Sequence, residues 1–179
     1  MRKQSAKSNL LFKALTFAAH KHRHQTRKGK KPIPYINYPI AVANLLVNVG
    51  NVADTATILA AILHDTVEDT PTTLRELEKE FGSIVSKLVA EVSDDKTLLS
   101  EQRKRLQIDH ASTLSRRARL IKLADKTCNL RDVVGDPPKG WSLQRKREYF
   151  DWGKSVVDKI RGANAALERA FDAAFSKRP

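Results

Sequence analysis

The stretch over residues 59–70, LAAILHDTVEDT, constrains this chain more than any other part of its sequence. An apolar run ends abruptly in His64 and Asp65, and a second acidic pair, Glu68 and Asp69, follows shortly afterwards. This ending places an imidazole and several carboxylates where a buried segment reaches a cavity or solvent. Such a set is typical of a metal site with an acid/base pair beside it. The alternative is a helix end followed by a polar turn, which a lone His-Asp pair would favour.

Length and composition describe an ordinary soluble chain. Its 179 residues fit one domain, and 41% hydrophobic with 30% charged residues is usual for globular proteins. The single cysteine, Cys128, excludes an internal disulfide framework and suits a reducing compartment. No apolar run approaches the roughly 20 residues that span a bilayer. We therefore expect one cytoplasmic domain with no membrane partner.

The net charge of +13 comes from 33 Lys and Arg residues against 20 Asp and Glu residues. Such an excess favours anionic partners: nucleic acid, a membrane surface or a phosphorylated small molecule. The basic residues lie in short clusters and form no tail. Each cluster taken singly is equally compatible with a solvated helix face.

Hydrophobic periodicity predicts helices joined by short turns, with no alternation typical of strands. Helix starts are expected at Asp54, Ser83, Ser115 and Asn164 and at the capping residues Ser5, Thr73 and Ser142, with Pro39 in the first position of another helix. The first helix is expected to run to about Gln25. Residues 93–114 are hard to assign apart from a short helix near 98–108. The expected fold class is all-α, a bundle of about eight to ten helices.

The helix around Asp125 carries a second acidic position of interest. At about 100° per residue, Asp125 falls roughly 40° beyond the apolar Ile121, at the rim of the buried face. Asn129 lies one turn on and Lys122 nearly one turn back. This arrangement suits a metal ligand with phosphate-binding neighbours, or equally a rim carboxylate paired with Lys122 or Arg131.

Several familiar phosphate and nucleophile motifs are absent from the sequence. It contains neither GxxxxGK[ST] nor GxGxxG, and it has only seven glycines. Phosphate would therefore have to be bound by Lys and Arg side chains and a metal. No Cys-x-x-Cys or HExxH pattern occurs, and Cys128 on an apolar helix face is expected to serve packing.

Five segments together resemble the small alarmone hydrolases, also called metazoan-type SpoT homologues. They are HRHQTRKGKKPIPYI at 22–36, HDTVEDT at 64–70, SDDKTL at 93–98, KLADKTCNLRD at 122–132 and GWSLQRKREYFDW at 140–152. The similarity runs in unbroken order over about residues 6–175. The chain is therefore identified as a member of this family, with a single HD-type hydrolase domain over residues 1–179 and its core at about 6–175.

The resemblance implies an HD-domain helical fold and a hydrolase that uses one manganese ion. It would remove the 3′-pyrophosphate from ppGpp or pppGpp, leaving GDP or GTP and pyrophosphate. By position, His64, Asp65 and Asp125 match the family's metal ligands. Glu68 and Asp69 match the pair that activates the attacking water, which agrees with the known chemistry of metal-assisted hydrolysis.

Further positions match the family's phosphate-binding residues. Arg27 and Lys28 match a basic pair after the first helix, and with Lys126 they would hold the pyrophosphate charges. Asn129 would contact the ribose and phosphate region.

The nucleotide end of the substrate is implied in the same way. Arg145 and Tyr149 match residues that line it, and Tyr35 is expected near the base. The partner implied is thus the small molecule ppGpp or pppGpp. Nucleic acid is the least favoured partner, and the oligomeric state is left open.

One position departs from the family pattern. Tyr38, in YINYPI, stands where the family has a His that is normally the first metal ligand. A phenol with a pKa near 10 is a poor substitute for imidazole, although three protein ligands can still hold a catalytic metal. The alternative function is an alarmone- or nucleotide-binding pseudoenzyme with a weakened metal site. An RNA-binding helical protein, suggested only by the charge, is a third reading.

Overall fold

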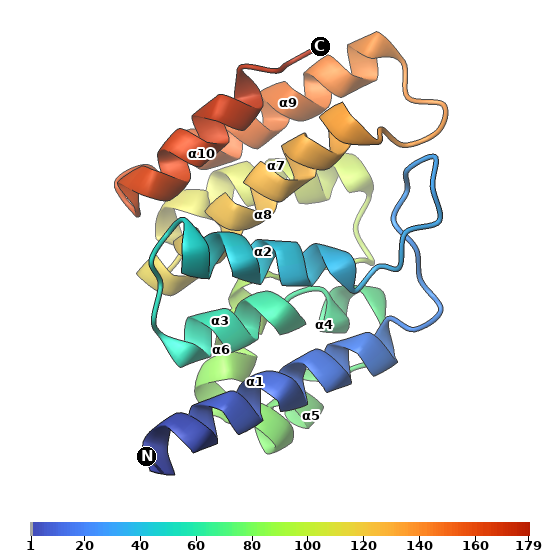
Figure 1. The fold of residues 1–179 in the computed structure, drawn as a ribbon. Helices are drawn as coiled ribbons and strands as arrows, with labels where there is room; N and C mark the ends of the chain where they lie inside the picture. Colours follow the sequence, from blue (N-terminus) through green and yellow to red (C-terminus); the bar gives the residue numbers. More distant parts are fainter. Residues whose placement is uncertain (1) are drawn as a thin grey trace.

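The computed structural model describes residues 2–179, so only Met1 of the predicted domain lies outside it, and side chains are described from residue 6. The elements are α1 (Arg2–Lys21), α2 (Asn37–Asn48), α3 (Thr55–Leu63), α4 (Thr66–Asp69), α5 (Leu74–Phe81), α6 (Ser83–Val92), α7 (Ser100–His110), the 3-10 helix η1 (Ala111–Thr113), α8 (Arg116–Gly135), α9 (Leu143–Asp158) and α10 (Ala165–Phe175) (Figure 1). Within residues 2–179 no strand forms, and an isolated bridge joins Thr26 to Pro34. The predicted all-α fold is confirmed.

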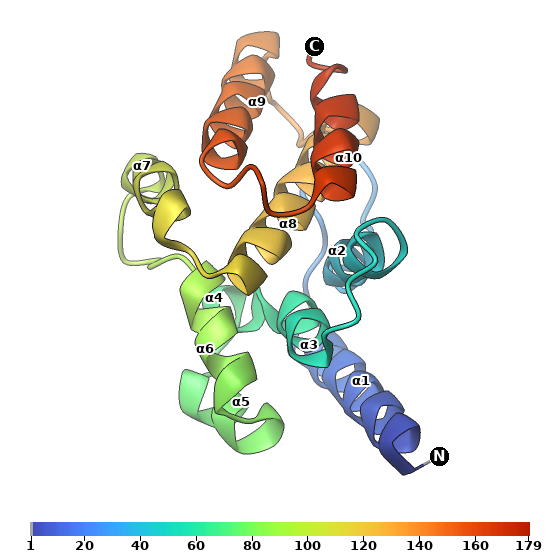
Figure 2. The ribbon, with the colours of Figure 1, turned by 90° about the vertical axis from the view of Figure 1, so that its left-hand side faces the viewer.

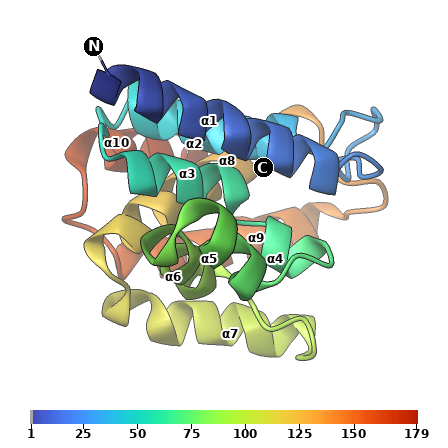
Figure 3. The same ribbon diagram turned by 90° about the horizontal axis from the view of Figure 1, so that it is seen from below.

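Helix α8 runs through the middle of the bundle. It packs against α2, α3, α6, α9 and α10, and Figure 2 shows α9 and α10 on one side of it and α3 and α6 on the other. Leu123 and Ala124 of α8 and Leu63 of α3 are fully buried there. Burying one leucine side chain contributes about 1.5–3 kcal/mol. Because neighbouring helices cover α8 on several sides, such burial holds it in the bundle. Seen from below, α1 and α7 flank opposite sides of α5 and α6 (Figure 3).

The starts predicted for six helices are confirmed: Ser83 is the first residue of α6 and makes no side-chain cap, and the other five helices begin at a capping residue. The side chains of Asp54, Thr73, Ser115, Ser142 and Asn164 each accept a hydrogen bond from a backbone N–H in the first turn of α3, α5, α8, α9 and α10. Each such cap stabilises its helix by about 1 kcal/mol, because it satisfies a donor that has no partner within the helix.

The expected boundaries of the first two helices are wrong. Helix α1 begins at Arg2, so Ser5 lies inside it, and it ends four residues before Gln25. Helix α2 begins at Asn37, so Pro39 is its third residue. The reason is local: the backbone N–H of Asn37 donates to the Pro34 carbonyl at 3.2 Å, and this turn starts the helix earlier.

No helix within residues 2–179 is both long enough and apolar enough to cross a bilayer.

Candidate active site

His64 stands at the point where the apolar helix α3 ends. The residue is only 5% exposed, and its Nδ1 lies 2.8 Å from the carbonyl oxygen of Ala61. Because a carbonyl can only accept, Nδ1 carries the proton and donates, which leaves Nε2 with the lone pair in the neutral ring. Among the residues that the structure describes, the buried Nε2 has no hydrogen-bond partner.

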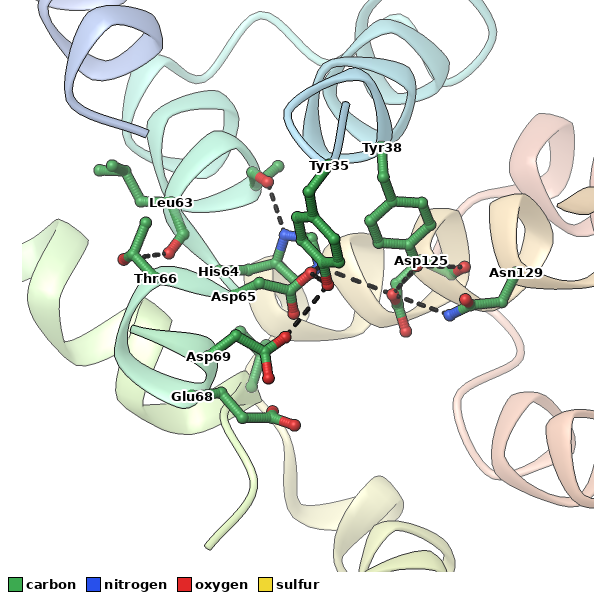
Figure 4. A network of polar contacts seen from close by, with 12 residues as sticks. Tyr35, Tyr38, Leu63, His64, Asp65, Thr66, Glu68, Asp69, Asp125 and Asn129 are labelled. Atoms are coloured by element: carbon green, nitrogen blue, oxygen red, sulfur yellow. Dashed lines mark hydrogen bonds and ion pairs between the residues drawn. The ribbon is translucent and has the colours of Figure 1, made fainter. Parts of the chain in front are cut away.

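Two carboxylates face this nitrogen (Figure 4). Nε2 of His64 lies 3.2 Å from Oδ2 of Asp65 and 3.6 Å from Oδ1 of Asp125. A lone pair facing two carboxylates is unfavourable unless a cation or a proton lies between them. Burial alone lowers the pKa of His64, but the Asp65 and Asp125 carboxylates outweigh it and raise the pKa to about 9. The spacing also suits adjacent ligands of an octahedral ion, which lie about 3 Å apart when the bonds are about 2.1 Å.

Asp125 is buried, with 8% exposure, and the prediction that it lies at the rim of the core is wrong. The helical wheel considered one buried face, whereas α8 is covered on several sides by its neighbours. The suggested pairing with Lys122 is also wrong, because Nζ of Lys122 donates to the carbonyl oxygen of Val92 at 2.7 Å. Asp125 instead pairs with Nζ of Lys126 at 3.1 Å. Although burial opposes it, this cation and His64 hold the pKa of Asp125 well below its usual range.

Tyr38 reaches the same carboxylate. Its hydroxyl donates to Oδ1 of Asp125, which also accepts from Nδ2 of Asn129 at 3.1 Å. Burial, and then the Asp125 charge, raise the pKa of the Tyr38 phenol well above its ordinary value. The guanidinium of Arg27 lies 3.7 Å from the centre of the ring. Tyr38 is therefore a protonated phenol that occupies an oxygen of the predicted metal ligand.

The three predicted ligands fit a divalent ion in donor type and in the spacings around His64. One imidazole nitrogen with carboxylate oxygens is a set that transition-metal ions accept. These three side chains do not fill all the coordination positions of such an ion, however. In the described part of the chain, no group of three or more His, Cys, Asp or Glu side chains is arranged so that it could hold a metal ion. The unpartnered Nε2 remains the observation that favours a cation.

Glu68 and Asp69 lie on the short helix α4 beside these groups. Oε2 of Glu68 accepts from the backbone N–H of Asp94 at 3.0 Å. Nζ of Lys96 bridges the pair, at 3.1 Å from Oε1 of Glu68 and 2.8 Å from Oδ1 of Asp69. Burial raises the pKa of Glu68, which brings this carboxylate nearer to the working range of a general base. Asp69 also accepts from the Tyr35 hydroxyl at 3.1 Å.

Two adjoining cavities meet at this site. The smaller, of about 210 Å³, contains the His64 and Glu68 groups, and the larger has a volume of about 600 Å³. Their common wall is formed by Arg27, Tyr35, Tyr38, Asp69, Asn129 and Tyr149. The smaller cavity also has a cationic side, formed by Arg103, Lys104, Lys122 and Lys126. The larger lies between the basic loop after α1 and the end of α8.

The predicted phosphate-binding residues gather around these cavities. Arg27 is anchored, since its Nε and Nη2 donate to Asp132 at 3.0 and 2.7 Å and Nη2 also donates to Asn129 at 3.2 Å. Lys28 lines the larger cavity. Lys126 is only 3% exposed, and its Nζ lies 4.2 Å from the centre of the Trp152 ring.

The residues expected at the nucleotide end are more dispersed. Tyr149 lines both cavities, whereas Arg145 lines neither; its guanidinium lies 4.8 Å from the ring of Trp141, which lines the larger one. The Tyr35 hydroxyl donates to Oδ2 of Asp65 at 2.7 Å, so this side chain lies at the acidic groups. Its expected place near the base stays a prediction.

Sequence reasoning gave no role to several side chains of the site. Lys96 lies in SDDKTL, a segment that carried the family resemblance, and its bridge between Glu68 and Asp69 depends on how two distant segments pack. Arg103 belongs to a basic cluster compatible with a solvated face, yet it lines the smaller cavity, 3.8 Å from Glu68. The signal in the sequence was the acidic pair Glu68 and Asp69, because two neighbouring carboxylates need a positive charge close by.

The chain is similar to known proteins over most of its length. The model of the HD domain family matches residues 14–149. A guanosine-3′,5′-bis(diphosphate) 3′-pyrophosphohydrolase MESH1 from Xenopus tropicalis is 50% identical over 171 residues, 96% of each chain. The chain belongs to the MESH1 family of HD-domain proteins. The Homo sapiens MESH1 is 50% identical over 168 residues, 94% of each chain. A solved structure of a metazoan SpoT ortholog that hydrolyses ppGpp has a TM-score of 0.92 and 47% identity, and covers 94% of this chain and 95% of its own.

Proposed function

We propose that this chain hydrolyses the 3′-pyrophosphate of ppGpp or pppGpp to give GDP or GTP and pyrophosphate, with the help of one divalent ion. The MESH1 relatives, named for this reaction, are half identical over nearly the whole chain. The observation that carries the proposal is the buried, unpartnered Nε2 of His64, which faces Asp65 and Asp125 in one cavity with Glu68.

His64, Asp65 and Asp125 would hold the ion, and we propose manganese, the ion that the family resemblance implies. When bound, the ion would polarise the phosphoryl group and lower the pKa of water. Glu68 would take a proton from the attacking water, because its raised pKa suits it as a base and the backbone N–H of Asp94 fixes its orientation. The water oxygen adds to the 3′-linked phosphorus, and the 3′-oxygen leaves and takes up a proton.

The two cavities suit the two parts of the substrate. The smaller would receive the pyrophosphate, where Lys126 and Arg103 supply positive charge beside the acidic groups. The larger is roomy enough for a nucleoside with its 5′-phosphates. Arg27 and Lys28, which the resemblance assigns to the pyrophosphate, lie along its basic side, and Arg27 also lines the smaller cavity. Asn129 and Tyr149, in the common wall, would contact the substrate between its two ends.

The whole chain would form one hydrolase domain, in keeping with a relative that matches 96% of it. It also places the protein in the cytoplasm, where its single cysteine, the buried Cys128, would stay reduced.

A second function, nucleotide binding without turnover, is favoured by the Tyr38 hydroxyl on Asp125. Purified protein assayed with ppGpp across a manganese titration separates the two functions. The hydrolase is supported when GDP and pyrophosphate appear in equal amounts and a chelator stops the reaction. Tight ppGpp binding with no product at saturating manganese would establish the binding module instead. Asp65→Asn, which removes one ligand charge, is the control for contaminating phosphatases.

A further inference from the structure

The basic loop after α1 is held by a carboxylate at the end of α8. The backbone N–H of Lys30 donates to Oδ1 of Asp136 at 2.8 Å, and that of Lys31 donates to Oδ2 at 3.3 Å. These N–H groups, Lys30 first, keep the pKa of Asp136 below its usual value. Asp136 is itself fixed, because its own N–H donates to the carbonyl oxygen of Asp132 at 2.8 Å.

Gly29 makes this contact possible because it has no side chain. A Cβ at this position would overlap Oδ2 of Asp136 and lie 2.5 Å from Cγ. The positive φ angles of described glycines are at Gly82, Gly140 and Gly162, so Gly29 is needed for space and not for an unusual backbone conformation.

A second attachment lies one turn earlier on α8. Asp132 accepts two hydrogen bonds from Arg27, so the last turns of the helix hold the loop at both of its ends. Arg27, Lys28, Gly29, Asp132 and Asp136 all line the larger cavity. The loop that would bring positive charge to the substrate is therefore fixed by a carboxylate that the helix supplies.

We propose that Asp136 is a positioning residue for anionic substrates: together with Gly29 it clamps loop 27–31 so that Arg27 and Lys28 are already in place along the larger cavity. A loop fixed before binding loses less conformational entropy when the ligand arrives, so affinity rises without any added contact. The link to ppGpp rests on the proposed function, whereas the clamp itself does not.

Limited proteolysis tests the clamp without any substrate. Trypsin cleaves after Lys and Arg, and Lys28 and Lys30 are loop sites that the clamp should protect. In Asp136→Ala we expect cleavage after these residues to accelerate by about three- to tenfold, because a loop that opens locally more often is cleaved faster. Asp136→Asn keeps an oxygen that can accept from the Lys30 N–H. Its loop should therefore be cleaved at a rate between those of the wild type and Asp136→Ala. Asp172→Ala, which removes an exposed carboxylate paired with Arg161, is the control of equal charge change.

The readout is the rate of each cleavage by mass spectrometry. A rise at the loop sites alone supports the clamp. An unchanged rate in Asp136→Ala, or an equal rise at every site in the chain, overturns it. Should Asp136→Ala not fold, the same comparison is made between Asp136→Asn and the wild type.

A double-mutant cycle gives the sharper test. Gly29→Ala should accelerate loop cleavage in the wild type but have little effect in Asp136→Ala, where the two atoms nearest to the added Cβ, the Oδ2 and Cγ of Asp136, are gone. Independent, additive effects of the two substitutions would exclude the clamp.

Kinetics then show whether the clamp serves binding. In Asp136→Ala we expect the KM for ppGpp to rise about three- to tenfold with kcat changed less than about twofold, since the acidic groups are untouched. A fall in kcat at constant KM contradicts a positioning role. If the wild type does not hydrolyse ppGpp, the proposed function fails while the proteolysis still decides the clamp.

Discussion

The two cavities share a wall but are built in different ways. In the smaller one, the buried residues His64, Asp125 and Lys126, each less than 10% exposed, lie beside the partly buried Asp65 and Glu68. The larger one is lined by a loop, helix ends and aromatic rings, and many of its residues are partly exposed. The comparison indicates that the core fixes the reacting groups, while a surface loop that needs its own clamp provides the binding charge. Substitutions of the acidic groups and of residues that contact them should therefore change kcat or ion affinity, whereas substitutions of residues that line only the larger cavity and do not contact these groups should change KM.

Glu68→Gln should have the largest effect. The amide has a similar shape but cannot take a proton, so kcat is expected to fall roughly 10²- to 10⁴-fold. Manganese binding, measured by calorimetry, should persist because Glu68 is not among the proposed ligands. Loss of the ion in this variant would show that Glu68 is itself a ligand.

Tyr38→His should raise manganese affinity by at least about tenfold, equivalent to ~1.4 kcal/mol. The imidazole adds a donor and removes the phenol from Asp125. Tyr38→Phe is the matched control, because it frees the Asp125 oxygen without adding a ligand. Equal affinities in the two variants would attribute the gain to the lost hydroxyl, and no gain in either would show that position 38 does not influence the ion.

Lys28→Ala should raise the KM for ppGpp by roughly tenfold, the effect of losing one charged hydrogen bond of ~1.5 kcal/mol, and leave kcat nearly unchanged. Lys87→Ala, an exposed lysine on α6, should change neither constant. A kcat effect at Lys28 would remove the distinction between the two cavities.

The smallest effect is expected at Lys96, which contacts the Glu68 carboxylate and lines the larger cavity. Its positive charge lowers the pKa of Glu68, so Lys96→Met should raise that pKa. Since the base must be deprotonated, the acidic limb of the kcat profile should move to higher pH, by less than about one unit. Lys96→Arg should restore the limb; a profile that both variants leave unchanged would show that Lys96 does not influence the base.

Some features of the acidic site could be predicted from the sequence and others could not. His64, Asp65, Glu68 and Asp69 could be identified because they lie together in one short motif at the end of an apolar helix. The burial of Asp125 could not, since a helical wheel does not show how many neighbours will cover α8.

Contacts between distant segments were missed for a related reason. The bridge from Lys96 to α4 and the hydrogen bond from Lys30 to Asp136 join chain segments that are not neighbours in sequence. No periodicity or local motif encodes such pairs. They follow only from how helices and loops meet in three dimensions.

Arg27 has a further consequence, because it lines both cavities and stacks on the ring whose hydroxyl contacts Asp125. An ion that displaces this hydroxyl would shift the ring beneath the guanidinium, and a nucleotide that pulls on the guanidinium would shift the ring in return. Ion and nucleotide occupancy would then be thermodynamically linked, and each ligand would change the affinity of the other by the same factor.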